Sequence, residues 1–120
     1  MLPTFLDIAT LAEGYRSGAF TPVDVIRAVI GRIEAWPDRA VWISRFDDAA
    51  LIAAAEALVA AGAPTDDQPL WGIPFAVKDN IDVAGLDTTA ACPAFAYRPD
   101  RDATVIARLK AAGALVIGKT

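Results

Sequence analysis

The chain has 120 residues, 55% of them apolar, and its 11 basic and 15 acidic residues give a net charge of −4. Because the basic residues are scattered among the acids, no positive patch forms, and we expect neither nucleic acid nor a membrane as a partner. The single cysteine and the absence of histidine exclude an internal disulfide, a cysteine-rich metal site and a Ser-His-Asp triad from these residues.

The distribution of apolar residues indicates where in the cell the protein is expected and whether the sequence is part of a larger domain. No run of about 18 apolar residues occurs, and Asp7 interrupts the N-terminal stretch where a signal peptide would have its apolar core, so we expect a cytoplasmic protein. The apolar share is high for one small domain, which suggests faces that further chain or a partner covers. We interpret the sequence as the N-terminal portion of something larger.

Three helices are predicted in the first half of the chain. Apolar residues recur at helical spacing over about residues 4–16, 21–36 and 48–61. The expected N-caps are Thr4, Thr21 and Asp48. Between the second and third helices, VWISRF at 41–46 is rich in β-branched and aromatic residues and predicts a short strand.

The second half alternates strands and helices. After a polar loop at 62–68, bulky and small residues alternate over 73–78, which predicts a strand that ends on a lysine. We expect a second short extended piece at 81–83, a helix at 102–112 capped by Asp102, and a strand at 114–117. This order predicts an α/β domain with a buried, mainly parallel sheet, of which three or four strands are present.

The last eight residues, GALVIGKT at 113–120, match the pattern of a nucleotide-binding phosphate loop. That loop requires a strand, then a glycine-rich turn, then a helix whose N-terminus faces the phosphates. Here a predicted helix comes first, Gly113 ends it, and an apolar strand follows. We therefore expect no ATP binding.

Lys78 is the candidate catalytic residue. Lysines at strand ends are usually surface residues, and that remains the alternative. Lys78, however, follows an apolar strand and precedes the polar Asp79 and Asn80 at a carboxyl strand end, where open α/β sheets place ligands. Burial would favour its neutral amine, which could accept a proton from a serine hydroxyl. Asp79 should lie on the opposite face of the strand, so we do not assume that it pairs with Lys78.

Several separated motifs resemble the amidase signature family. LWGIPFAVKDNIDVAGLDTT is followed by Pro99-x-x-Asp102-Ala103 and then by VIARLKAAGALVIGKT. Members of that family share GIP-x-x-VKD, a later TT, P-x-x-DA and AGA-x-x-x-GKT, and the match covers about residues 69–120. The resemblance implies an α/β/α sandwich with a mixed, mainly parallel central sheet. It implies a helical lead-in over about 1–62 and the start of the core sheet over about 69–120, with the rest of the domain outside this chain.

The same resemblance implies a Ser-cisSer-Lys triad without metal or organic cofactor. The lysine aligned with Lys78 takes the proton that a nucleophilic serine passes on through a second serine. Both serines belong to a glycine- and serine-rich motif beyond Thr120, so we expect these 120 residues to be inactive alone. The family resemblance also implies that the GKT motif closes a core strand and binds no nucleotide.

The segment ACPAFAY indicates which substrate the family resemblance favours. Many family members have Gly-Ser where this chain has Ala91-Cys92, and ACPAFAY is similar to allophanate hydrolases, which cleave urea-1-carboxylate in urea or s-triazine nitrogen catabolism. We favour this small-molecule amide, with release of ammonia and carbon dioxide. The alternatives are another small amide, an amidotransferase subunit, or a non-catalytic structural module. A homodimer of the full-length protein remains an open alternative.

Residues near Lys78 have simpler interpretations. Cys92 lacks the cationic surroundings of a reactive thiolate, so we interpret it as a small packing residue. Thr88 and Thr89 either place hydroxyls near the site or satisfy the backbone of a turn. Trp71 and Phe95 either line a pocket or pack in the core, and we favour the core.

Overall fold

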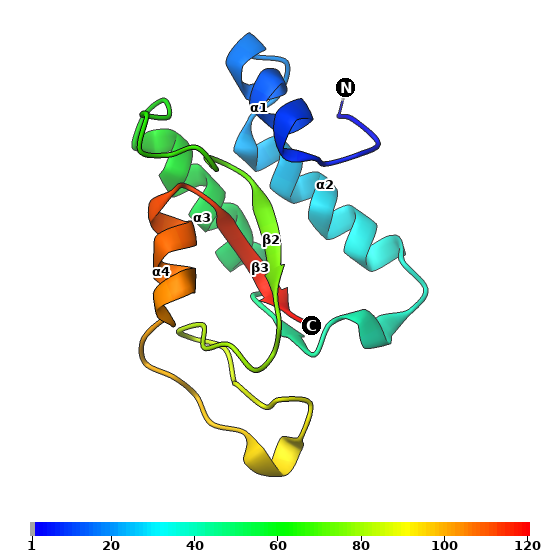
Figure 1. Cartoon of the computed structure of the whole chain (residues 1–120). Helices are drawn as coiled ribbons and strands as arrows, with labels where there is room; N and C mark the ends of the chain where they lie inside the picture. Colours follow the sequence, from blue (N-terminus) through cyan, green and yellow to red (C-terminus); the bar gives the residue numbers. More distant parts are fainter. Residues whose placement is uncertain (1) are drawn as a thin grey trace.

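A computed structural model describes residues 2–120 (Figure 1). Its helices are α1 (Ile8–Ser17), α2 (Pro22–Ala35), α3 (Asp48–Ala60) and α4 (Thr104–Ala111), with single 3₁₀ turns at Arg39–Val41 and Pro93–Phe95. Its strands are β1 (Ser44–Arg45), β2 (Pro74–Val77) and β3 (Leu115–Lys119). The alternation of helices and strands expected for an α/β domain is confirmed.

The three strands form one small mixed sheet in the order β1-β3-β2. β2 runs parallel to β3, with Phe75 opposite Val116 and Val77 opposite Lys119. β1 runs antiparallel to β3 and places Arg45 opposite Gly118. The carboxyl ends of β2 and β3 therefore meet at one edge of the sheet, which is where parallel strands present residues for ligands.

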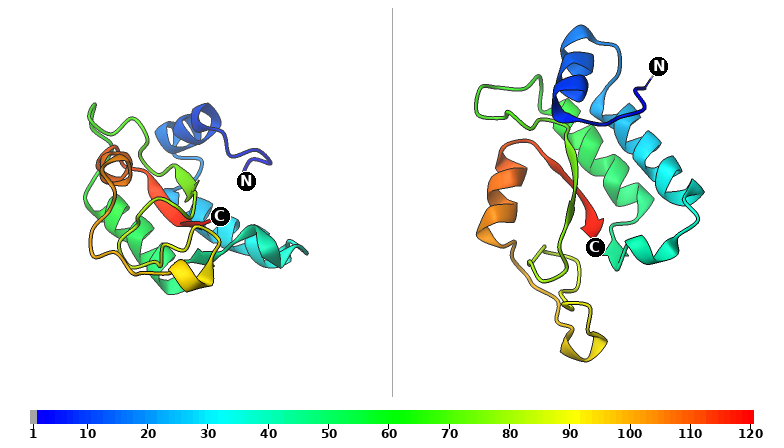
Figure 2. Two further views of the ribbon diagram at one scale, coloured as in Figure 1. Left: turned by 60° about the horizontal axis from the view of Figure 1, so that its bottom comes forward. Right: turned by 45° about the vertical axis from the view of Figure 1, so that its right-hand side comes forward.

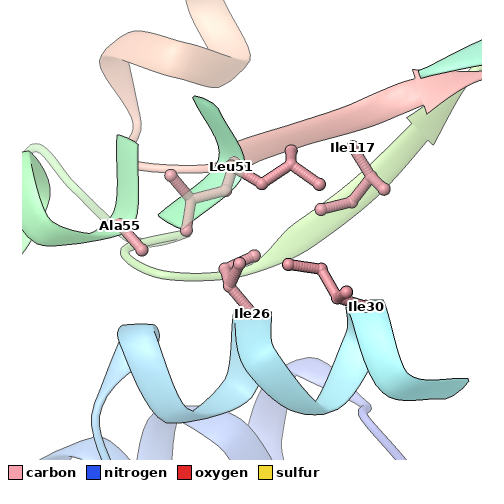
Figure 3. Packing of buried hydrophobic residues seen from close by; sticks show 6 residues of the cluster. Ile26, Ile30, Leu51, Ala55 and Ile117 are labelled. Carbon is pink, nitrogen blue, oxygen red and sulfur yellow. The ribbon is translucent and has the colours of Figure 1, made fainter. Parts of the chain in front are cut away.

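Helices cover both faces of the sheet. Figure 2 shows β2 and β3 between α4 on one side and α2 with α3 on the other. Leu115 and Ile117 of β3 pack against α2 and α3 in one cluster, and Figure 3 shows Ile117 facing Ile26 and Ile30. Val116 packs instead with Ile106 of α4. This alternation follows from the period of two along a strand, and because both faces are covered every residue of β3 is buried.

The N-terminal helix packs against the beginning of β2. Leu11 of α1 meets Val25 of α2 and Ile73 in a third buried cluster. The Tyr15 hydroxyl donates a 2.7 Å hydrogen bond to the carbonyl of Gly72, and burial raises the pKa of this phenol. These contacts fix α1 relative to the strand that leads to Lys78.

Of the three N-caps predicted in the first half of the chain, one is correct and two lie at the wrong residue. Thr21 caps α2 through a reciprocal capping box with Asp24, as expected. α1 is instead capped by Asp7, whose carboxylate accepts the Thr10 N–H, so the predicted start at Thr4 is wrong. In the same way Asp47, and not Asp48, caps α3.

The start of α4 has no side-chain cap, unlike the starts of α1, α2 and α3. Its N-cap is Ala103, which provides no side-chain hydrogen bond, so the predicted cap at Asp102 is wrong. The Asp102 carboxylate is engaged elsewhere, because it accepts the Ala84 N–H at 2.8 Å and pairs with Lys110 at 2.8 Å. Asp102 therefore ties the loop before the helix to the last turn of that helix.

Two predicted extended segments are shorter than expected or absent. The strand within the segment 41–46 is only Ser44–Arg45, because residues 39–41 form a 3₁₀ turn first, although the Ile43 and Phe46 N–H groups also bond to carbonyls of β3. Residues 81–83 form no strand, and they follow a turn at residues 79–80 in which the Ile81 N–H bonds to the Lys78 carbonyl at 3.0 Å. Of their side chains, those of Trp42, Phe46, Ile81 and Val83 pack in the core, whereas Val41 and Ile43 remain exposed.

Large apolar side chains remain exposed in the described residues, as the composition suggested. They include Phe5, Ile8, Trp36, Phe95 and Val105. None of the helices in residues 2–120 has the length and apolar character needed to cross a bilayer.

Candidate active site at the carboxyl ends of β2 and β3

Lys78 follows β2 directly and stands beside a small pocket. The pocket has a volume of about 140 Å³ and is lined by Ile43, Lys78, Asp79, Asn80, Ala90, Ala91 and Thr120. Its walls come from the end of β2, the end of β3, the segment before β1 and the turn at residues 89–92. The segment 80–103 extends from the carboxyl ends of the strands (Figure 1). The predicted placement of Lys78 at a carboxyl strand end is confirmed.

The Lys78 side chain is exposed. Within residues 2–120, no hydrogen bond or ion pair joins its amine to another side chain. The burial on which the general-base hypothesis depends is thus not supplied by these residues. What they supply is an amine beside a pocket at the carboxyl ends of the parallel strands, without an acidic partner of its own.

Asp79 points away from Lys78 and into the protein. It is 2% exposed, and its Oδ1 lies 3.2 Å from the Nζ of Lys119. Its Oδ2 accepts hydrogen bonds from the Thr89 hydroxyl and, at 3.5 Å, from the Ala91 N–H. The expectation that Asp79 is not the ion-pair partner of Lys78 is confirmed.

The environment of Asp79 keeps it charged. Burial by itself raises the pKa of this carboxyl, because it disfavours the ionised form. Hydrogen bonds from Thr89, Lys119 and Ala91, together with the positive charge of Lys119, outweigh burial, so the pKa of Asp79 lies below its ordinary value. An ionised carboxylate and a lysine amine therefore face each other in the interior.

Lys119 is the lysine of the GKT motif, and it is fully buried. Its Nζ donates to the Asp87 carbonyl at 3.2 Å in addition to its contact with Asp79. Because Gly118 and Lys119 lie within β3, the motif has no loop in which to hold phosphate, and the rejection of a phosphate loop is supported. Sequence reasoning missed the role of Lys119; a lysine that ends a fully apolar strand is the signal for a buried partner.

The two threonines act in different networks. Thr89 binds Asp79, whereas the Thr88 hydroxyl donates to Asp82 at 2.7 Å. Asp82 also accepts a 2.6 Å hydrogen bond from the Tyr97 hydroxyl, which lowers the pKa of Asp82 and raises that of Tyr97. Backbone pairing of Thr88 with Tyr97 closes this loop. Both threonine hydroxyls thus order the loop beside the pocket.

The packing roles expected of two residues are wrong for this chain. Cys92 is exposed, and Phe95 is 58% exposed, because the 3₁₀ turn that follows Cys92 projects away from the sheet. Trp71 is half-buried and packs edge-on against Tyr15 with ring centroids 5.4 Å apart, in agreement with the packing interpretation. Residues 2–120 bring together no group of three side chains suited to hold a metal ion.

The class of protein follows from comparison of this arrangement with known families. The profile of the Amidase family matches residues 24–120, and the chain belongs to that family. This agrees with the resemblance of residues 69–120 and extends it across α2, β1 and α3.

Individual relatives show which members of the family the sequence resembles. The chain is 52% identical over 84 residues to a urea amidolyase of Lachancea kluyveri, in an alignment that covers 70% of this chain and 4% of the relative. It is 44% identical over 117 residues to a glutamyl-tRNA(Gln) amidotransferase subunit of Lacticaseibacillus paracasei, covering 94% of this chain and 23% of the relative. The chain thus spans at most about a quarter of these curated relatives.

Solved structures share the fold. The chain superposes on the allophanate hydrolase of Kluyveromyces lactis with a TM-score of 0.80 and 35% identity, over 100% of this chain and 20% of that one. It superposes on the peptide amidase of Stenotrophomonas maltophilia with a TM-score of 0.84 and 32% identity, over 98% of this chain and 25% of that one. The α/β fold of amidase signature enzymes, expected from the motifs, is confirmed.

Proposed function

We propose that residues 1–120 form the N-terminal part of an amidase domain that hydrolyses allophanate and that Lys78 is the proton acceptor of its triad. In this proposal a serine outside the chain attacks the amide carbonyl carbon. Its proton passes through a second serine to the neutral amine of Lys78. The resulting ammonium returns the proton to the leaving nitrogen as the C–N bond breaks, which releases ammonia, and water then hydrolyses the acyl-serine.

The observation that carries this proposal is the position of Lys78. Its amine stands beside a pocket at the meeting point of two parallel strand ends, and the neighbouring carboxylate of Asp79 is already engaged by Lys119 and Thr89. An amine without a carboxylate partner is easier to deprotonate once further chain removes it from water, because burial then acts without an opposing charge. The exposure of Lys78 in residues 2–120 is consistent with a site that other parts of the domain complete.

The choice of allophanate rests on the relatives. The local identity is higher to urea amidolyases, at 52% over 84 residues and 64% over 52 residues, than to the amidotransferase subunits. The allophanate hydrolase of Kluyveromyces lactis matches the whole of this chain in fold. Together with the ACPAFAY segment, these likenesses support a small, charged urea derivative as the substrate.

A second candidate is an amidotransferase subunit. The likeness to the glutamyl-tRNA(Gln) amidotransferase of Lacticaseibacillus paracasei extends over 117 residues, farther along the chain than the likeness to urea amidolyase. In that reading the same lysine serves a serine that removes ammonia from a glutamine side chain, and a partner receives the ammonia.

A substrate panel separates the two candidates. The full-length amidase that contains this segment is incubated with allophanate, with glutamine and with a simple amide such as acetamide, and ammonia is measured. The proposal predicts turnover of allophanate well above the other two substrates. Release of ammonia from glutamine alone favours the amidotransferase, and no release from any of them favours a non-catalytic module.

A further inference from the structure

The ends of β2 and β3 are joined by a buried pair of charges. Lys119 is the last residue of β3, and Asp79 is the second residue after the end of β2, directly after Lys78. The side chains of Lys119 and Asp79 are 0% and 3% exposed. The Asp79 N–H also bonds to the Thr120 carbonyl at 2.9 Å. The backbone on both sides of Lys78 is thereby held against the end of the neighbouring strand.

Asp79 also holds the turn that forms the opposite wall of the pocket. Its main-chain carbonyl accepts the Ala90 N–H at 3.1 Å, and its carboxylate accepts the Ala91 N–H and the Thr89 hydroxyl. Lys119 reaches the same loop separately through the carbonyl of Asp87. One acid and one lysine thus connect two strands to the loop over residues 87–91.

The turn needs such support because of its backbone conformation. Ala90 has a φ of +49° and Ala91 a φ of +60°, in the left-handed region where residues with a Cβ are strained. Both alanines line the pocket beside Lys78. Strained residues keep such a conformation only when their surroundings fix it, so a loosened turn would change the wall of the pocket.

We propose that Lys119, acting through Asp79 and Thr89, is a positioning residue that holds the Ala90–Ala91 turn as the wall of the substrate pocket. Lys119 itself touches no substrate in this proposal, which rests on the proposed function only for the identity of the pocket's ligand. Its effect on the amidase is to keep the distance between that wall and Lys78 constant, so it should act on substrate binding more than on proton transfer.

The order of the turn can be measured without any activity. Cys92 is the only cysteine of the sequence, is exposed and lies next to the turn, so a nitroxide attached to it reports local motion by electron paramagnetic resonance. Four variants are compared with the wild type. They are Thr89→Val, Thr89→Ser, the double variant Lys119→Met with Asp79→Leu, which removes both charges and the acceptor for Thr89, and the control Lys110→Met, which removes a lysine–aspartate pair away from the pocket.

The proposal expects the label to move about twofold faster or more in Thr89→Val and in the double variant. Thr89→Ser keeps a hydroxyl for Asp79 and should behave as the wild type, as should Lys110→Met. If the double variant loses its helical circular dichroism, the pair Thr89→Val and Thr89→Ser decides. A folded double variant, or Thr89→Val, with a label as immobile as that of the wild type overturns the proposal.

The kinetic effect is tested in the full-length amidase. Thr89→Val should raise KM for allophanate about threefold to tenfold with a smaller change in kcat, and Thr89→Ser should restore the wild-type KM. A threefold to tenfold loss in kcat of Thr89→Val with no change in KM would contradict the role of this network in positioning the wall. If the label responds as expected but Lys78→Ala keeps its activity, the positioning role stands and the proposed function fails; the reverse result rejects the positioning role alone.

Discussion

Lys119 and Asp79 form a buried ion pair of 3.2 Å between the ends of two adjacent parallel strands. Lys119 belongs to the stretch that looks like a phosphate loop, and Asp79 belongs to the VKD stretch about forty residues earlier in the chain. Their contact explains the lysine of one motif and the aspartate of the other by a structural role that involves no nucleotide. The two neighbouring residues of the VKD stretch thus differ, because Lys78 is exposed whereas Asp79 is buried.

Removing one member of this pair should destabilise the chain strongly. Lys119→Met leaves the Asp79 carboxylate buried without its counterion, which costs about 3–5 kcal/mol in the free energy of unfolding. The double variant Lys119→Met with Asp79→Asn removes both charges, so it should cost less than Lys119→Met alone. Urea unfolding followed by circular dichroism measures both. A single variant that is as stable as the wild type contradicts the buried pair.

Acid should destabilise the fold through the same carboxyl. The pKa of Asp79 is lowered in the folded state, so below its ordinary value of 3.8 the unfolded state binds the proton more readily than the folded one. The stabilisation is present above that pH and is lost as the pH falls through the folded-state pKa. Asp82 and Asp102 have lowered pKa values as well and act in the same direction.

The measurement is the free energy of unfolding at pH 7 and at about pH 3, in the wild type and in the double variant Lys119→Met with Asp79→Asn. The double variant should show a smaller loss on acidification, because one of the carboxyls responsible is gone. Equal losses in the two proteins would show that Asp79 does not contribute.

Gly118 should tolerate no side chain. A Cβ built on it lies 2.5 Å from the Ser44 carbonyl oxygen and 2.5 Å from the Arg45 Cβ, so Gly118→Ala must push β1 away from β3 at a cost of about 1–3 kcal/mol. Gly31→Ala is the matched control, because nothing lies within 4 Å of its Cβ and the residue is within α2. That change should stabilise the helix by about 0.5–1 kcal/mol. Thermal unfolding of both variants checks the contrast, and equal effects would refute the close approach of β1.

Two threonines near the N-terminus test the helix caps. Thr21 accepts the Asp24 N–H at the start of α2, so Thr21→Ala should cost about 1 kcal/mol of stability. Thr4 resembles a cap in the sequence but lies four residues before the first residue of α1, and its side chain caps nothing there. Thr4→Ala should therefore change the unfolding free energy by less than about 0.5 kcal/mol. A larger effect of Thr4→Ala than of Thr21→Ala would favour the start predicted from the sequence.

Local signals sufficed where the sequence and the packing agree. The capping box at Thr21, the alternation that ends on Lys78 and the apolar strand after Gly113 all predicted their elements, because each depends on residues near one another. The helix start at Asp102 failed for a tertiary reason: its carboxylate serves Ala84, eighteen residues away. The segment 81–83 has strand-like residues but directly follows a turn at Asp79 and Asn80. Asp and Asn favour turns, and the strand prediction did not take that signal into account.

The candidate site was predicted in part. The position of Lys78 followed from the strand pattern, and its separation from Asp79 followed from the alternation of side chains along a strand. The network of Lys119, Asp79 and Thr89 was missed, because its members come from three segments that only the fold brings together. Cys92 was expected to pack because it lacks the surroundings of a reactive thiolate, and Phe95 because it is aromatic, yet both are exposed on a loop that projects beyond the sheet.

The most direct test of the proposed function is ammonia release from allophanate by the full-length amidase carrying Lys78→Ala, with Lys110→Ala as a lysine control away from the pocket. We expect Lys78→Ala to lose at least about a thousandfold in kcat, as removal of a triad member does, with its circular dichroism unchanged. Lys110→Ala should keep the wild-type rate. A folded Lys78→Ala protein that releases ammonia at close to the wild-type rate would contradict the assignment of Lys78 as the proton acceptor.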